Sequence, residues 1–183
     1  MRSLELRRHS FTKKGLSRGH GSHLSVEGVR AARRLGEGLG TFDYVVASTS
    51  PRTLETAVAM GCAVDELIEM TSPVETGEVE FHAWRGWANP FEVFRQMTTA
   101  SPAFRAYARA KAAEVRVAVE RLDDGCVLLA VGHGGWLEAI VSELVAPEYV
   151  HELGGSFWHL DGIRLVFTGS GPGAIEAVDR YPR

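Results

Sequence analysis

The chain has 183 residues, of which 45% are apolar and 23% are charged, and its formal net charge is −3. This composition is typical of a globular domain with a buried core, and it excludes a disordered or fibrous protein. The small negative charge argues against general electrostatic binding to nucleic acid or to an anionic membrane. No apolar stretch approaches the roughly 20 residues of a membrane span, and residues 1–8 lack the apolar core of a secretory signal. Two cysteines are too few for a disulfide scaffold, so we expect a cytoplasmic protein. The length predicts a single domain over residues 1–183.

Short strands and helices alternate in the first third of the chain. Ser25 is a typical helix N-cap, apolar residues recur after it at helical spacing, and Gly40 ends that run. Pro51 is well placed as the first residue of a second helix. We therefore expect strands over residues 4–8 and 43–48 and helices over residues 26–39 and 51–60. This alternation is the pattern of an α/β sheet.

The remaining elements follow from longer patterns. Residues 126–131 form a continuous apolar run, which is typical of a strand buried on both faces. Asp161-Gly162 predicts a hairpin turn. We expect helices over residues 90–98, 102–122 and 136–145, and strands over residues 126–131, 157–160, 163–168 and 174–178. The predicted fold is a three-layer α/β/α domain with a mixed, mainly parallel sheet, and residues 70–122 are expected to form a small cap of helix and loop over the carboxyl ends of the strands.

Three of the predicted strands end in residues that suit an anion. Arg8 and His9 end the first strand, Arg52 follows the second, and His133 follows the apolar run. Ligands of open α/β sheets bind at the carboxyl ends of the strands, where helix N-termini also point. Two guanidiniums and two imidazoles repel one another unless an anion lies between them. A phosphoryl group fits this set, because arginine matches its oxygens with a planar fork.

The same residues lie in motifs that identify a family. The first reads Arg8-His9-Ser10 after a strand, where the family has Arg-His-Gly. The others, in chain order, are Leu24-Ser25-Val26-Glu27-Gly28, Ser48-Thr49-Ser50-Pro51-Arg52-Thr53-Leu54-Glu55-Thr56-Ala57 and Gly132-His133-Gly134-Gly135. Together they resemble the histidine phosphatase superfamily, also called phosphoglycerate-mutase-like, from the first strand to past the middle of the chain.

The resemblance implies phosphomonoester hydrolysis through a covalent phosphohistidine. His9 would attack phosphorus, while Arg8, Arg52 and His133 would hold the phosphoryl oxygens and offset the developing charge. Ser10 replaces the usual glycine, and its hydroxyl either donates a further hydrogen bond to the phosphate or reshapes the pocket. We expect no metal and no other cofactor, because the arginines and His133 supply the positive charge.

The resemblance also implies a leaving-group acid, often the Glu of a Glu-x-x-x-Gly-x-Trp-x-Gly pattern. Residues 78–86 match this pattern with His82 in the first glycine place. The spacing selects Glu78 over Glu75 and Glu80. Glu78 would protonate the leaving oxygen and then help to activate water.

Two alternatives to a phosphatase stay open at this point. A mutase shares the chemistry but returns the phosphoryl group to a bound substrate, whereas a catalytically weak module would only bind a phospho-ligand or a partner. The expected substrate is a phosphorylated small molecule or a phosphoprotein, and neither nucleic acid nor membrane is an expected partner. The His20-x-x-His23 pair lacks the neighbouring ligands that would complete a metal site, so we interpret both as loop histidines.

Overall fold

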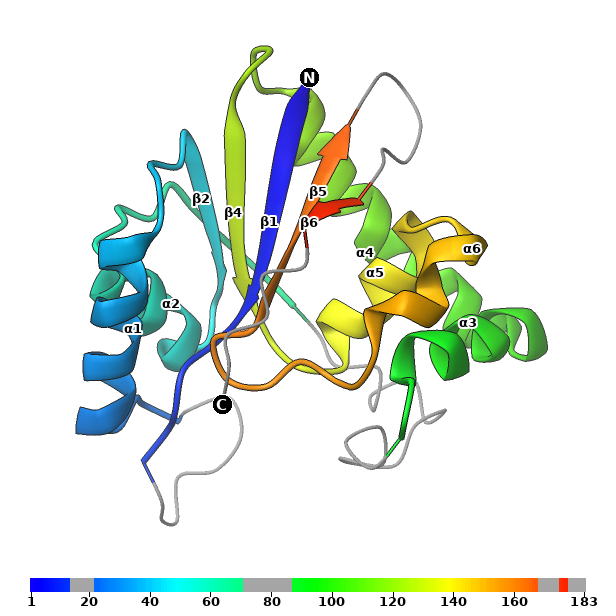
Figure 1. The fold of residues 1–183 in the computed structure, drawn as a ribbon, viewed down its shortest axis with the longest axis horizontal. Coiled ribbons are helices and arrows are strands. Elements are labelled where there is room, and N and C mark those ends of the chain that lie inside the picture. The colour runs from blue at the N-terminus through cyan, green and yellow to red at the C-terminus, as the bar shows by residue number, and fades with distance from the viewer. Residues whose placement is uncertain (14–21, 71–86, 168–174, 178–183) are drawn as a thin grey trace.

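The fold is built on a mixed sheet. The computed structural model describes residues 1–13, 22–70, 87–167 and 175–177. Within them the strand order is β3-β2-β4-β1-β5-β6 (Figure 1). The strands are β1 (Arg2–Arg8), β2 (Tyr44–Ser48), β3 (Glu66–Ile68), β4 (Val127–Gly132), β5 (Gly162–Phe167) and β6 (Ile175–Ala177). The first four run parallel, while β5 is antiparallel to β1 and to β6. The expected mixed, mainly parallel sheet is confirmed.

Helices cover both faces of this sheet. They are α1 (Val26–Gly38), α2 (Pro51–Ala59), α3 (Pro90–Ala100), α4 (Pro102–Glu120), α5 (Trp136–Leu144) and α6 (Pro147–Val150), followed by the short 3-10 turn η3 (His151–Leu153). Figure 1 shows α1 and α2 on one side of the sheet and α4 and α5 on the other. None of the helices in the described residues is long and apolar enough to cross a membrane.

The strand β4 links the two halves of the core. Leu128 and Ala130 pack in one cluster with the buried side chains of α4 and α5. Leu129 and Val131 point the opposite way, into a second cluster with α1 and α2. Both faces of β4 are therefore buried, as the continuous apolar run predicted.

Helix α4 corrects part of the expected cap. Its buried residues Ala112, Val115 and Val119 belong to the same core cluster as the sheet residues Leu4 and Leu128. The helix contacts β1, β4 and α5, so it forms part of a layer that covers the sheet. A 19-residue helix with an apolar stripe needs a broad apolar surface to cover, and the sheet provides it. Residues 71–86, the other part of the expected cap, lie outside the described residues.

The expected hairpin around Asp161-Gly162 does not form. Residues 157–160 are not a strand, and β5 pairs with β1 instead. Asp161 closes a local turn: its carboxylate accepts a hydrogen bond from the Trp158 N–H, and its own N–H donates to the Trp158 carbonyl. Gly162 suits this place because a Cβ there would lie 2.9 Å from the Leu6 carbonyl oxygen. The turn therefore lies at residues 158–161, Gly162 already belongs to β5, and the prediction of a hairpin turn at Asp161-Gly162 is wrong.

Candidate active site

Three parallel strands carry the predicted residues to one edge of the sheet. Arg8 is the last residue of β1 and His9 follows it, Arg52 lies in the first turn of α2 after β2, and His133 follows β4. Arg8, His9 and His133 are 4%, 7% and 8% exposed. The rings of His9 and His133 are 5.4 Å apart, and the Arg52 guanidinium lies 3.1 Å from the His133 ring. The structure thus brings these four side chains together.

The tautomer of His9 follows from its backbone contact. Its Nδ1 lies 2.8 Å from the carbonyl oxygen of Ser10. A carbonyl oxygen only accepts hydrogen bonds, so Nδ1 carries the proton and donates it. The other ring nitrogen, Nε2, then keeps its lone pair whenever the ring is neutral. This arrangement is the one that a nucleophilic imidazole requires.

The surroundings of His9 favour the neutral ring. Burial lowers the pKa of His9 well below its usual value, and the charge of Arg8 lowers it further. His133 also lowers the pKa of His9, the Ser10 carbonyl raises it, and Arg52 adds a smaller lowering effect. At neutral pH the imidazole of His9 is therefore uncharged, and its Nε2 carries the lone pair.

His133 is fixed from both sides of its ring. Its Nδ1 faces a guanidinium nitrogen of Arg52 at 3.1 Å, and its Nε2 lies 2.9 Å from the hydroxyl of Ser48. Because a guanidinium only donates, Nδ1 is the acceptor and Nε2 carries the proton that goes to Ser48. Burial lowers the pKa of Arg52 from its usual value. Ser48, at the end of β2, is a supporting residue that the sequence motif contained without indicating this role.

The structure directs the side chain of Ser10 away from the other site residues. Its hydroxyl donates to the carbonyl oxygen of Gly28 at 2.8 Å, and its backbone N–H donates to the hydroxyl of Thr56 at 3.0 Å. Of the two roles considered for Ser10, this arrangement matches the shaping of the pocket, because the hydroxyl proton is already used. Ser10 ties the end of β1 to both α1 and α2.

Arg8 lies in a tightly built corner. Its Nη1 donates to the carbonyl oxygen of Phe157, and a Cβ placed on Gly134 would lie 3.1 Å from the centre of the guanidinium. Behind it lies Glu138 in the first turn of α5, whose side chain is fully buried. A side chain at position 134 would therefore press on the guanidinium, which is a physical reason for the glycine at this position of the Gly132-His133-Gly134-Gly135 motif.

A third imidazole, which the sequence analysis did not select, lies beside the predicted nucleophile. The ring of His159 is 5.5 Å from that of His9 and 4.8 Å from that of Phe11. The next residue, Leu160, has a positive φ of 69°, a conformation that costs free energy for a residue with a Cβ. Its carbonyl oxygen accepts a hydrogen bond from the buried guanidinium of Arg7, and its N–H donates to the carbonyl of Arg8. No local pattern marks His159, because an irregular turn places it.

Several predicted residues lie outside the part of the chain that the structure describes. They include the acid Glu78, the alternatives Glu75 and Glu80, and His20. His23 is described, and its Nδ1 pairs with the Glu55 carboxylate on α2. The described ranges contain no group of three or more His, Cys, Asp and Glu residues that could hold a metal ion.

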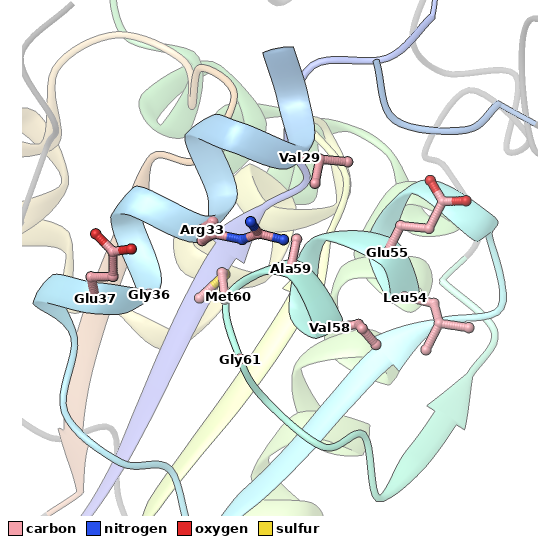
Figure 2. Close-up of a pocket in the computed structure, with 10 residues that line it drawn as sticks. All are labelled: Val29, Arg33, Gly36, Glu37, Leu54, Glu55, Val58, Ala59, Met60 and Gly61. Carbon is pink, nitrogen blue, oxygen red and sulfur yellow. The ribbon is translucent and has the colours of Figure 1, made fainter. Parts of the chain in front are cut away.

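A large groove among the described residues lies elsewhere. It has a volume of about 730 Å³ and runs between α1 and α2, with Arg33 and Glu37 on one wall and Leu54 and Val58 on the other (Figure 2). None of the predicted site residues lines it. The predicted site residues therefore lie at the strand ends and not in this groove.

Comparison with protein families identifies the superfamily of the chain. A family model of the histidine phosphatase superfamily (branch 1) matches residues 4–154. The chain belongs to this superfamily. The matched range contains every site residue that the sequence analysis predicted, whereas His159 lies beyond it. Membership supports phosphatase or phosphoryl-transfer chemistry. The search of curated protein sequences found no match to the chain.

Solved structures with the same fold include several phosphatases. A phosphoserine phosphatase from Entamoeba histolytica, in complex with 3-phosphoglyceric acid, aligns with a TM-score of 0.66 at 19% identity over 99% of this chain and 98% of that chain. The protein histidine phosphatase SixA with tungstate gives 0.64 at 14% identity over 96% and 94%. A mycobacterial glucosyl-3-phosphoglycerate phosphatase gives 0.55 at 20% identity over 89% of both chains. These similarities establish the fold of this superfamily member.

Proposed function

We propose that the protein hydrolyses phosphomonoesters through a covalent phosphohistidine on His9. The observation that carries this proposal is the hydrogen bond from His9 Nδ1 to the Ser10 carbonyl, which leaves Nε2 as the nucleophilic atom. The lowered pKa of His9 keeps that atom unprotonated at neutral pH. Arg8 and Arg52 lie near the ring and supply guanidinium donors for a phosphoryl group. In this proposal His133 also donates, by turning its Nε2–H from the Ser48 hydroxyl to a phosphoryl oxygen.

The reaction then proceeds in two balanced steps. His9 Nε2 forms a bond to phosphorus while the bond to the leaving oxygen breaks, and that oxygen takes a proton. Water then attacks the phosphohistidine, the N–P bond breaks, orthophosphate leaves, and the water proton passes to a base. We assign both proton transfers to Glu78 on the strength of its motif.

The substrate class in this proposal is a phosphorylated small molecule or a phosphoprotein. A phosphoryl dianion between the arginines offsets their mutual repulsion, so the site favours an anionic group. The similar structures with 3-phosphoglyceric acid and tungstate hold anions of this kind. We propose a cytoplasmic location because the sequence has only two cysteines, as is usual in a reducing compartment.

A phosphoenzyme experiment tests the role of His9. Brief incubation of the protein with a labelled aryl phosphate should give an acid-labile, base-stable phosphoenzyme, and His9→Gln should lose both this species and turnover. The exposed His151 provides a matched control, so His151→Gln should behave as the wild type. Substantial turnover by His9→Gln contradicts the proposal. Return of the label to a second bound substrate would identify a mutase, and vanadate binding without turnover would identify a binding module.

A chelation experiment tests the expected independence from metal ions. Because guanidiniums supply the positive charge at the site, turnover after treatment with EDTA should stay within about twofold of the turnover of untreated protein. Vanadate, which adopts a five-coordinate geometry, should inhibit in the absence of metal. Loss of turnover in EDTA, with recovery on addition of zinc or magnesium, would replace the metal-free mechanism by a metal-assisted one.

A further inference from the structure

Glu138 is a fully buried carboxylate next to the proposed phosphoryl site. Both of its oxygens accept backbone hydrogen bonds: Oε2 from the N–H of Gly135 and Oε1 from the N–H of Phe157, at 2.9 Å. Gly135 belongs to the loop of His133, whereas Phe157 belongs to the loop that precedes β5. One side chain therefore joins two loops that are separated in sequence but adjacent at the site.

Burying this carboxylate requires compensation. Burial has the largest effect and raises the pKa of Glu138 on balance, while the positive charge of Arg8 and the backbone N–H groups of Gly135, Phe157 and Glu138 itself act to lower it. An isolated buried carboxylate is strongly unfavourable, so these partners are what keep it in place. The Gly132-His133-Gly134-Gly135 motif does not include position 138, and the two-step mechanism proposed above gives Glu138 no role.

The same loop also holds Arg8. The Phe157 backbone donates its N–H to Glu138 and accepts a hydrogen bond from Arg8 Nη1 at its carbonyl oxygen. On another side the backbone of Gly134 lies so close to the guanidinium that a Cβ on this glycine would be 3.1 Å from the central carbon. The plane of the guanidinium is therefore set by backbone groups whose own positions depend on Glu138.

We propose that Glu138 is a positioning residue that fixes the guanidinium of Arg8 for the phosphoryl group. Glu138 does so by holding the Phe157 backbone, which accepts from Arg8, and the N–H of Gly135, the residue after the Gly134 that lies against the guanidinium. The inference rests on the proposed function, because it assigns Arg8 to the phosphoryl oxygens. It adds a residue that acts on the site without contacting the substrate.

Charge and position make opposite predictions for one variant. Glu138→Gln removes a negative charge close to the anion site, so an effect of charge alone would strengthen anion binding. If position dominates, the amide NH₂ of glutamine faces one of the two backbone N–H groups, the loop shifts, and Arg8 loses its alignment. We expect the second result. Binding of vanadate and kcat/KM should both weaken by about 10- to 100-fold, the range for a lost hydrogen bond to a charged group.

A double-mutant cycle separates positioning from a general loss of structure. Vanadate affinity is measured by calorimetry for the wild type, Glu138→Gln, Arg8→Lys and the double variant. Arg8→Lys keeps the charge but removes the planar fork. If Glu138 acts through Arg8, adding Glu138→Gln to Arg8→Lys should weaken binding by less than about threefold, since coupled residues are not additive. Glu143→Gln, on the same helix but paired with Arg109 instead, is the control and should bind vanadate as the wild type does.

Each outcome decides the inference. Unchanged or tighter vanadate binding by Glu138→Gln overturns it, as do additive losses in the cycle. If Glu138→Gln does not fold, Glu138→Asp replaces it: the charge stays, but the shorter side chain cannot reach both backbone N–H groups, and the same weakening is expected. Wild-type protein that binds no vanadate would overturn the proposed function itself, and this inference with it, so the two failures are distinguishable.

Discussion

At the scale of single residues, the neutral imidazole of His9 links catalysis to stability. The pKa of His9 is lowered in the folded protein first by burial and then by Arg8, whereas in the unfolded chain it returns to about 6.5. Below about pH 6.5 the unfolded state therefore binds more protons than the folded state. The contribution of His9 to the free energy of unfolding falls as the pH drops from about 6.5 towards the lowered pKa.

This difference in proton binding can be measured. Between about pH 7.5 and 5.5, the wild type should lose more stability than His9→Gln, by up to about 1.4 kcal/mol per pH unit below pH 6.5. Urea unfolding at a series of pH values gives both curves. Parallel curves for the two proteins would show that His9 keeps its ordinary pKa in the folded state.

His159 allows a second test at the residue scale. Its ring lies between Phe11 and His9, so we expect it to hold the nucleophile in place by packing. His159→Ala should then lower kcat/KM by about 10-fold or more, since small displacements of reacting groups are costly. His159→Phe keeps a flat ring there and should stay within about threefold of the wild type. If both variants lose activity equally, the imidazole acts through its nitrogens.

At the scale of elements, the approach of α1 to the end of β1 shapes the site. Ser10 donates to the carbonyl of Gly28, and a Cβ on Gly28 would lie only 2.1 Å from the Phe11 carbonyl oxygen. The helix can come this close only because residue 28 has no side chain. The loop that carries His9 therefore depends on a glycine in a neighbouring helix.

A pair of glycine variants tests this close contact. Gly28→Ala should destabilise the protein by about 1–3 kcal/mol, the usual cost of overpacking, and should lower kcat/KM by displacing the loop. Gly40→Ala is the matched control, because a Cβ on Gly40 meets nothing within 4 Å. Urea unfolding and aryl phosphate turnover report on the two effects. A Gly28→Ala protein as stable and active as Gly40→Ala would refute the argument.

Most elements could be predicted from the sequence because each has a local signal. The helix cap at Ser25, the proline at position 51 and the apolar run of β4 are of this kind. The strand β3 was not predicted, because its three residues are exposed or only partly buried and the strand is too short to show a periodic pattern. The expected hairpin at Asp161-Gly162 was wrong because pairing of β5 with the distant β1 decided the structure.

The same distinction applies to the candidate site. Arg8, His9, Arg52 and His133 were predictable because the carboxyl ends of parallel strands meet at one edge of a sheet. The roles of Glu138 and His159 were not, since each depends on contacts with a loop far away in sequence or with an irregular turn. Such contacts leave no periodic pattern in the chain, so only the folded arrangement reveals them.

At the scale of the whole molecule, the sheet joins the two ends of the described chain. The strand β1 pairs with both β4 and β5, and β4 contributes to the core clusters on both faces. A third cluster, around Phe94 and Phe104, contains no strand residue, but its helices α3, α4 and α5 also contribute side chains to the cluster that covers the sheet. We therefore expect the chain to behave as the single domain that the sequence predicted.

Calorimetry tests this expectation of one domain. Thermal unfolding should show one transition in which the calorimetric and van't Hoff enthalpies agree. Substitutions on opposite faces of the sheet, such as Leu35→Ala in α1 and Val115→Ala in α4, should lower the midpoint of that one transition. Two separate transitions, each sensitive to only one of these variants, would show two independently folding units.

The central position of β1 also has a consequence for how the protein is made. The strand that leads to His9 comes from the first residues of the chain, but its partners are residues 127–132 and 162–167. At roughly 5–20 residues per second, a ribosome adds the first of these partners on the order of ten seconds after β1. Until then a nascent chain contains a central strand with neither neighbour, so its apolar residues depend on chaperones or on transient contacts. The strand β1 is thus synthesised well before both of its neighbours are available to enclose it.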